Sequence, residues 1–168
     1  MPAVTPSTTP LATLRDPAPG DMGRVVTLHG EVYAREYGWD ARFEGMVAGI
    51  VSDYVKHHRA GLERCWVAEW QGQMVGSAFV VRKDDNTAQL RMLIVSPEAR
   101  GQGLGRRLVN ECLAFARQAG YRRITLWTND VLVAARQIYV ATGFVRVAVE
   151  EHQSFGQRLM GETWERGL

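Results

Sequence analysis

Apolar residues recur along this 168-residue chain with two different spacings. In some segments they return every three or four positions, as on one face of a helix, and elsewhere they alternate or form the short runs typical of strands. The helical pattern covers residues 21–36, 41–58, 104–119 and 131–142. The strand pattern covers residues 11–15, 65–70, 74–81, 87–95, 123–127, 144–150 and 159–164. The chain therefore predicts mixed α/β structure in the order β-αα-βββ-α-β-α-ββ.

Turn-forming residues mark the boundaries of these elements. Gln71-Gly72 is expected to turn a hairpin between two of the strands. Asp130 is expected to cap the helix over 131–142, because its side chain can accept a hydrogen bond from the first turn. Asn129 beside it suits a turn residue and a cofactor ligand equally well. The last two strands are expected to be joined by a loop that contains His152 and Gly156.

The chain is organised as one domain preceded by a short tail. Residues 1–10 contain three prolines and no charged side chain, so we expect a disordered N-terminal tail. Residues 11–168 are long enough to bury one sizeable core. Hydrophobic residues make up 46% and charged residues 23%, as in ordinary globular proteins.

Charge and cysteine content narrow the choice of partner and compartment. A net charge of +2 is too small to favour a nucleic-acid partner. We find neither a secretory signal nor an apolar run of the ~20 residues that a membrane span needs. Cys65 and Cys112 are far apart in the chain and are interpreted as free thiols, which favours a cytoplasmic location. The histidines show no ligand spacing, so no metal is expected.

A glycine-rich segment carries the strongest chemical signal. Arg100-Gly101-Gln102-Gly103-Leu104-Gly105 follows a strand-length apolar run over 90–95 and opens the predicted helix over 104–119. Glycines without side chains let the backbone approach a phosphate, and a helix start adds free N–H groups and the positive end of the helix dipole. The segment therefore predicts a site for a phosphorylated ligand.

Two common phosphate motifs do not fit this segment. A P-loop needs Lys and Ser or Thr after its last glycine, whereas Gly105 is followed by Arg106 and Arg107. A dinucleotide fingerprint places its third glycine three residues after the second and lies near the first strand of a βαβ unit. Here the glycine spacing is two and two, and the loop lies past the middle of the chain.

The segment instead resembles the signature Arg/Gln-x-x-Gly-x-Gly/Ala of the GCN5-related N-acetyltransferase (GNAT) family. Its context strengthens the resemblance, with Val95-Ser96-Pro97 before it and Ile138-Tyr139 and Gly143-Phe144 downstream at the family's usual distance. The resemblance covers roughly residues 11–166. It implies a GNAT fold, with a mostly antiparallel, twisted sheet of about seven strands and about four flanking helices.

Three further stretches resemble the acetyltransferase half of bacterial proteins that fuse a MarR-type DNA-binding domain to such an enzyme. They are the segments at 28–40, 126–130 and 154–156. Because no residues precede position 1 to form the DNA-binding half, the expectation is a free-standing relative.

The resemblance implies acetyl-CoA as cosubstrate and a primary amine of a small molecule or peptide as acceptor. It places the cofactor against the strand and loop formed by Leu93, Ile94, Val95, Arg100, Gly101, Gln102, Gly103, Leu104, Gly105 and Arg106. The strand backbone would align the pantetheine arm, and an N–H near Leu93 would stabilise the oxyanion.

Tyr139 stands at the family's general-acid position, where its hydroxyl can protonate the leaving CoA thiolate. A glutamate that some members carry corresponds to about Trp127 here, and an asparagine that many members carry corresponds to Leu132. The general base therefore remains open among water and four side chains, namely Glu31, Glu36, Glu150 and His152.

The sequence leaves alternatives for the role of the aromatic residues in the acceptor region and for the class of function. Tyr33, Tyr37, Trp39 and Phe43 suit a flat or apolar amine, but aromatic residues of a small domain more often form core. The main hypothesis is an N-acetyltransferase acting by direct attack in a ternary complex. The alternative is a catalytically silent CoA-binding or sensing module, which would not need a proton donor at Tyr139. A homodimer is left open.

Overall fold

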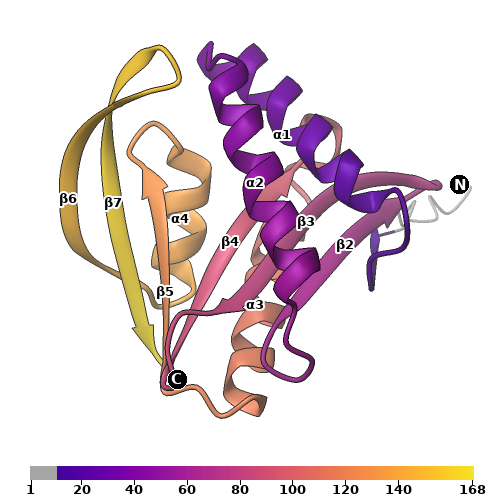
Figure 1. Cartoon of the computed structure of the whole chain (residues 1–168), viewed down its shortest axis with the longest axis vertical. Coiled ribbons are helices and arrows are strands. Elements are labelled where there is room, and N and C mark those ends of the chain that lie inside the picture. Colours follow the sequence, from indigo (N-terminus) through magenta and orange to yellow (C-terminus); the bar gives the residue numbers. More distant parts are fainter. Residues whose placement is uncertain (1–10) are drawn as a thin grey trace, which may run out of the picture.

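The computed structural model describes residues 11–168, and the tail predicted at residues 1–10 lies outside the described residues. Within that range the chain forms one seven-stranded sheet and four α-helices (Figure 1). The strands are β1 (Thr13–Arg15), β2 (Arg64–Trp70), β3 (Gln73–Arg82), β4 (Thr87–Val95), β5 (Arg123–Asn129), β6 (Val145–Ser154) and β7 (Gln157–Gly167). The helices are α1 (Asp21–Tyr37), α2 (Ala41–His57), α3 (Leu104–Gln118) and α4 (Val133–Ala141). The predicted fold class and order of elements are confirmed.

The sheet has the strand order β1-β2-β3-β4-β5-β7-β6. All neighbouring strands are antiparallel except β4 and β5, which are parallel. The parallel pairing runs only from Thr87 opposite Arg123 to Leu90 opposite Leu126. Beyond this point the two central strands have no pairing with each other, although β4 continues to Val95 and β5 to Asn129.

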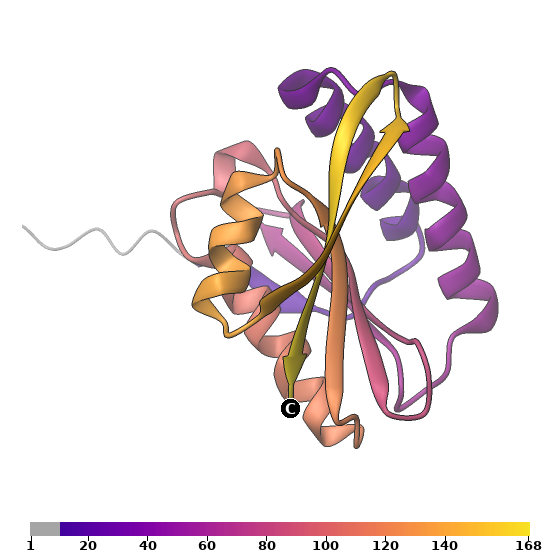
Figure 2. The same cartoon turned by 90° about the vertical axis from the view of Figure 1, so that its left-hand side faces the viewer.

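Helices cover both faces of the sheet (Figure 2). Each pair of helices buries its own apolar cluster. On one face Val25 of α1 and Val47 of α2 belong to the cluster that contains Phe79 of β3. On the other face Leu108 of α3 belongs to the cluster that contains Val80, the next residue of β3. The alternation of side chains along a strand thus supplies both cores from the same segment.

A β-bulge interrupts β4 where it leaves β5. Ser77 of β3 pairs with Ile94 and Phe79 pairs with Arg91, so two residues of β4 lie opposite one residue of β3. Within the bulge Met92 has a φ of 51°, a conformation that non-glycine residues rarely adopt. The Ser77 hydroxyl donates to the Met92 carbonyl at 3.0 Å and helps to hold this conformation.

The last hairpin differs from its prediction. β6 and β7 pair from Val145 to Ser154, and only Phe155-Gly156 form the turn, both with positive φ. His152 therefore lies on β6 and not in a loop. The strand was predicted only as far as residue 150, where alternating valines occur, because the continuation over 151–154 is Glu-His-Gln-Ser, which has no apolar position to mark a strand.

The start of the fourth helix also differs. The helix begins at Val133, and the residue before it, Leu132, makes no side-chain cap. Asp130 does not cap it, because the chain still follows the sheet there and its N–H donates to the Met160 carbonyl at 3.0 Å. Backbone pairing with β7 outweighs the local capping preference.

Cys65 and Cys112 are both buried and free, as predicted. Burial raises the pKa of Cys65 to about 12 and the pKa of Cys112 well above its ordinary value, so neither thiol is activated. No helix within residues 11–168 combines the length and apolar character required to cross a membrane.

The close approach of β3 and β4 at Gly76 gives a testable prediction. A Cβ at Gly76 would lie 2.7 Å from the Ile94 carbonyl oxygen, so Gly76→Ala must push the strands apart beside the bulge. We expect a loss of ~1–3 kcal/mol in the free energy of unfolding, measured by urea denaturation. Gly49→Ala is the matched control, because nothing described lies within 4 Å of its Cβ on α2, and it should gain ~0.5–1 kcal/mol. A neutral Gly76→Ala would contradict this account.

Candidate functional site

The segment between β4 and α3 forms an open cradle of backbone. Gly101 and Gly103 have φ values of 77° and 76°, and no atom of the described chain would lie within 4 Å of a Cβ at either position. The first helical hydrogen bond of α3 runs from the Arg107 N–H to the Gly103 carbonyl at 3.0 Å. The N–H groups at the start of the helix therefore have no intrahelical partner and are available to an anion.

The third glycine of the loop serves a different purpose. A Cβ at Gly105 would lie 2.7 Å from Cδ1 of Ile138 on α4. The absence of a side chain lets the first turn of α3 pack directly against α4. Gly105 thus fixes the distance between the loop and the helix that carries Tyr139.

The loop cavity, of about 250 Å³, lies between this cradle, α1 and α4. It contains nine of the ten residues predicted to bind the cofactor. They are Leu93, Ile94, Val95, Arg100, Gly101, Gly103, Leu104, Gly105 and Arg106. The tenth, Gln102, lines a separate small cavity on the other side of the loop, beside Leu11 and Arg107.

Arg100 braces the loop against its neighbours. Its Nε donates to the Val95 carbonyl at 3.1 Å, and its two terminal nitrogens bind the Glu36 carboxylate at 2.5 and 3.2 Å. The ion pair joins the loop to α1 across the loop cavity. It also occupies Glu36, one of the candidates for the general base.

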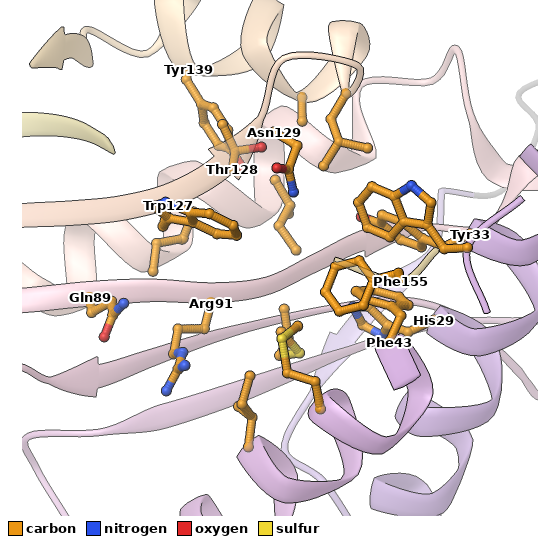
Figure 3. A pocket seen from close by; sticks show the side chains of 18 residues that line it. His29, Tyr33, Phe43, Gln89, Arg91, Trp127, Thr128, Asn129, Tyr139 and Phe155 are labelled. Atoms are coloured by element: carbon orange, nitrogen blue, oxygen red, sulfur yellow. The ribbon is translucent and has the colours of Figure 1, made fainter. Parts of the chain in front are cut away.

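A second cavity, of about 150 Å³, lies where β4 and β5 separate (Figure 3). We call it the aromatic cavity. Tyr139 reaches it from α4, while His29, Tyr33 and Phe43 form a cluster on the other side. Both cavities are lined by the same four residues where they meet, Tyr33, Leu93, Leu132 and Ala135. The two cavities are thus neighbours that share one wall.

The aromatic residues predicted for the acceptor region belong to the core and also line a cavity. Trp39 and Phe43 are buried, and their rings lie 4.9 Å apart in an edge-on arrangement. Both line the aromatic cavity together with Tyr33, whereas Tyr37 lines the loop cavity. The two interpretations of these residues are therefore compatible.

Tyr139 is 5% exposed and packs against two aromatic rings. Phe144 and Trp164 lie 5.7 and 6.3 Å from it, centre to centre. Burial raises the pKa of Tyr139 well above its ordinary value of 10. The hydroxyl therefore stays protonated at neutral pH and can act as a hydrogen-bond or proton donor.

A polar chain that the sequence did not indicate connects β5 with β6. His152 Nε2 lies 2.7 Å from Asn129 Oδ1, and His152 Nδ1 lies 2.9 Å from the Ser154 hydroxyl. Asn129 is buried at the end of β5 and lines the aromatic cavity, and its carbonyl accepts the Leu132 N–H at 3.0 Å, so it also begins the turn after the strand. Since strand pairing brings β6 beside β5 through β7, only the folded sheet reveals this contact.

His29 is a second residue that the sequence analysis missed. It is 1% exposed, its Nδ1 lies 2.8 Å from the Val25 carbonyl, and its buried Nε2 has no hydrogen-bond partner within residues 11–168. Burial lowers the pKa of His29 from 6.5 to about 4, so the ring is neutral at physiological pH. Its spacing of four from Tyr33, on which it stacks at 5.9 Å, was the available sequence signal.

The carboxylates considered as bases do not reach the aromatic cavity. Glu31 and Glu150 are exposed and line neither cavity, and Glu36 lines the loop cavity. No Asp or Glu is present among the described residues that line the aromatic cavity. His152 does not line the cavity itself but contacts two residues that do, Asn129 and Trp127.

Comparisons with known proteins agree with this architecture. The acetyltransferase of Streptococcus agalactiae has a TM-score of 0.77 over 94% of this chain and 98% of its own, at 21% identity. The protein yncA of Salmonella typhimurium, solved with its cofactor acetyl-CoA, has a TM-score of 0.74 over 94% of both chains, at 19% identity. The fold is therefore that of acetyltransferases.

The family model described as the acetyltransferase (GNAT) family matches residues 29–144, and the chain belongs to this family. Among curated relatives, N-acetylaspartate synthetase of Danio rerio is 40% identical over 87 residues, 51% of this chain and 31% of the relative. Human N-acetyltransferase 8B is 36% identical over 100 residues, 56% of this chain and 44% of the relative. The chain thus spans about a third to a half of the length of these two relatives.

The buried histidine predicts a pH-dependent stability. Between pH 6.5 and about 4 the unfolded chain holds a proton on His29 that the folded chain does not, so folding stability falls as the pH falls through this window. Urea denaturation of the wild type and of His29→Phe at several pH values isolates this contribution. The wild type should lose on the order of 3 kcal/mol more than the variant by pH ~4. Identical pH dependences would contradict the burial of a neutral His29.

Proposed function

We propose that this protein is an N-acetyltransferase that moves an acetyl group from acetyl-CoA to a primary amine by direct attack in a ternary complex. One observation carries the proposal. The loop cavity, with its backbone cradle, and the aromatic cavity, with Tyr139, share a wall at Leu93. A donor in the first and an acceptor in the second would bring their reacting groups together at that wall.

The residues of the loop cavity fit the phosphates and the pantetheine arm of acetyl-CoA. Gly101 and Gly103 leave space above the backbone, and the first N–H groups of α3 open toward it. Arg106 lines the same cavity and adds positive charge. Leu93, Ile94 and Val95 belong to the part of β4 that is not paired with β5, so their backbone can bind an extended arm as a neighbouring strand would.

The chemistry assigns Tyr139 as general acid. Acetyl-CoA supplies an activated acetyl thioester, and the amine forms the new amide bond while the thiolate leaves. Tyr139 would give its phenolic proton to that thiolate, and a backbone N–H at the bulge near Leu93 would stabilise the oxyanion. Since no carboxylate lines the aromatic cavity within the described chain, the ammonium form of the acceptor would lose its proton to water.

The names of the relatives support N-acetylation. N-acetylaspartate synthetase and N-acetyltransferase 8B are named for that reaction, and yncA was solved with acetyl-CoA. The kinship with MarR fusion proteins and the absence of a nucleic-acid partner stay predictions. A silent CoA-binding module is distinguished from the enzyme by turnover, since such a module would bind acetyl-CoA and release no CoA.

Removal of the Tyr139 hydroxyl tests the assignment of the acid. Tyr139→Phe should lower kcat by about 100-fold or more while acetyl-CoA affinity stays within about twofold, because the ring and its packing remain. CoA release against a panel of amines measures the former, and calorimetry the latter. Tyr121→Phe is the control, since Tyr121 lines neither cavity and its hydroxyl donates to the Leu62 carbonyl. Unchanged turnover in Tyr139→Phe would remove it as the acid.

Substitution of Gly103 tests the phosphate cradle. Gly103→Asp should abolish measurable acetyl-CoA binding, because it places a negative charge where the phosphates would lie. Gly103→Asn is the matched control, because asparagine tolerates the left-handed conformation and adds similar bulk without charge. Calorimetry should therefore find partial affinity in Gly103→Asn and none in Gly103→Asp. Equal binding by both variants and the wild type would rule out this loop as the pyrophosphate site.

A further inference from the structure

The aromatic cavity has an unbalanced charge. Eighteen of the described residues line it, and these include one Lys or Arg, namely Arg91, and no Asp or Glu. His29 is neutral because of its burial. The other polar side chains that line the cavity are uncharged and carry hydroxyl, amide or indole N–H groups, as in Tyr139, Asn129 and Trp127. Any ligand of this cavity therefore meets one net positive charge.

Arg91 has no anionic partner among residues 11–168. No hydrogen bond or ion pair joins its guanidinium to another residue of the described range, in contrast to Arg100, Arg136 and Arg146. Its side chain is half-buried, and burial lowers the pKa of Arg91, while Asp53 on α2 acts only as a more distant, opposing charge. A partly buried guanidinium without a partner has lost hydration that no contact replaces. An anion in the cavity would supply that contact.

The position of Arg91 indicates where the anion would lie. Gln89 and Arg91 line the cavity from β4, on the side away from the aromatic cluster, as Figure 3 shows. Leu93, where the two cavities meet, follows Arg91 by two residues, on the other side of the bulge residue Met92, and lines the same cavity. An anion bound by Arg91 and an amine beside Leu93 would therefore occupy one small cavity, which suits a small molecule whose amine and anion are separated by one or two carbon atoms.

We infer that the acceptor is a free amino acid or a close analogue, whose carboxylate is bound by Arg91 and whose amine lies beside Leu93. The inference rests on the proposed function. The planar guanidinium can hold a carboxylate through two parallel hydrogen bonds, and the Gln89 amide adds a further donor beside it. The small cavity and its rings favour an apolar or aromatic side chain. A polyamine would place a second ammonium against Arg91, and a lysine within a protein offers no carboxylate near its amine.

Matched substrate pairs test the inference. Alanine, leucine, methionine and phenylalanine are each compared with their primary amides, which keep the amine and lose the negative charge. Acetyl-CoA-dependent CoA release should give a kcat/KM about 10- to 100-fold higher for at least one amino acid than for its amide. Arg91→Gln should remove this preference by lowering the value for the acid alone, and Arg91→Lys should retain part of it. Arg117→Gln, on the exposed face of α3, should behave as the wild type.

Calorimetry of acetyl-CoA binding to each variant distinguishes failure of the proposed function from failure of the inference about Arg91. If the wild type does not bind acetyl-CoA, the proposed function fails. If it binds acetyl-CoA but uses amides as well as acids, or uses neither, the inference about Arg91 is overturned. It is also overturned if Arg91→Gln lowers turnover of acid and amide equally. Gln89→Glu is an independent check, because a carboxylate beside Arg91 should weaken use of the acids without removing the guanidinium.

Discussion

The separation of β4 from β5 is the constraint on which the site depends. A parallel pair that kept its hydrogen bonds to the end would close the sheet and leave no room between the strands. Here the pairing stops at Leu90 and Leu126, and the bulge at Met92 turns β4 away. The backbone beyond that point is free to bind a ligand, and α4 can bring Tyr139 to the opening.

The sequence predicted most of the fold because its helices and inner strands are half-buried. Each of these helices has apolar residues at helical spacing on one face, and Val25, Val47 and Leu108 are examples from α1, α2 and α3. The pattern was weak in the second half of the edge strand β6, where the polar residues 151–154 around His152 were taken for a loop. Asp130 has a strong capping preference, but pairing of the chain with β7 decided the helix start.

The site was predictable to the extent that it is local. The conformation of the glycine loop is determined by its own residues, and nine of the ten residues predicted to bind the cofactor line one cavity. His29, Arg91 and the Asn129–His152 contact come from elements far apart in the chain, and each is defined by what packs around it. His29 is neutral because the fold buries it, and Arg91 has no ion-pair partner within residues 11–168 because of what packs around it. Neither property can be read from the spacing of residues along the sequence.

The ion pair between Arg100 and Glu36 ties the glycine loop to the helix that carries His29 and Tyr33. Both side chains are partly exposed, and such pairs contribute only ~0–1 kcal/mol. A phosphate arriving at the loop can compete with Glu36 for the same guanidinium, as one anion exchanged for another. Dissolved ions screen the charge of Arg100. Ionic strength is therefore expected to change both the binding of a phosphate at the loop and the contact between the loop and α1, which lines the aromatic cavity.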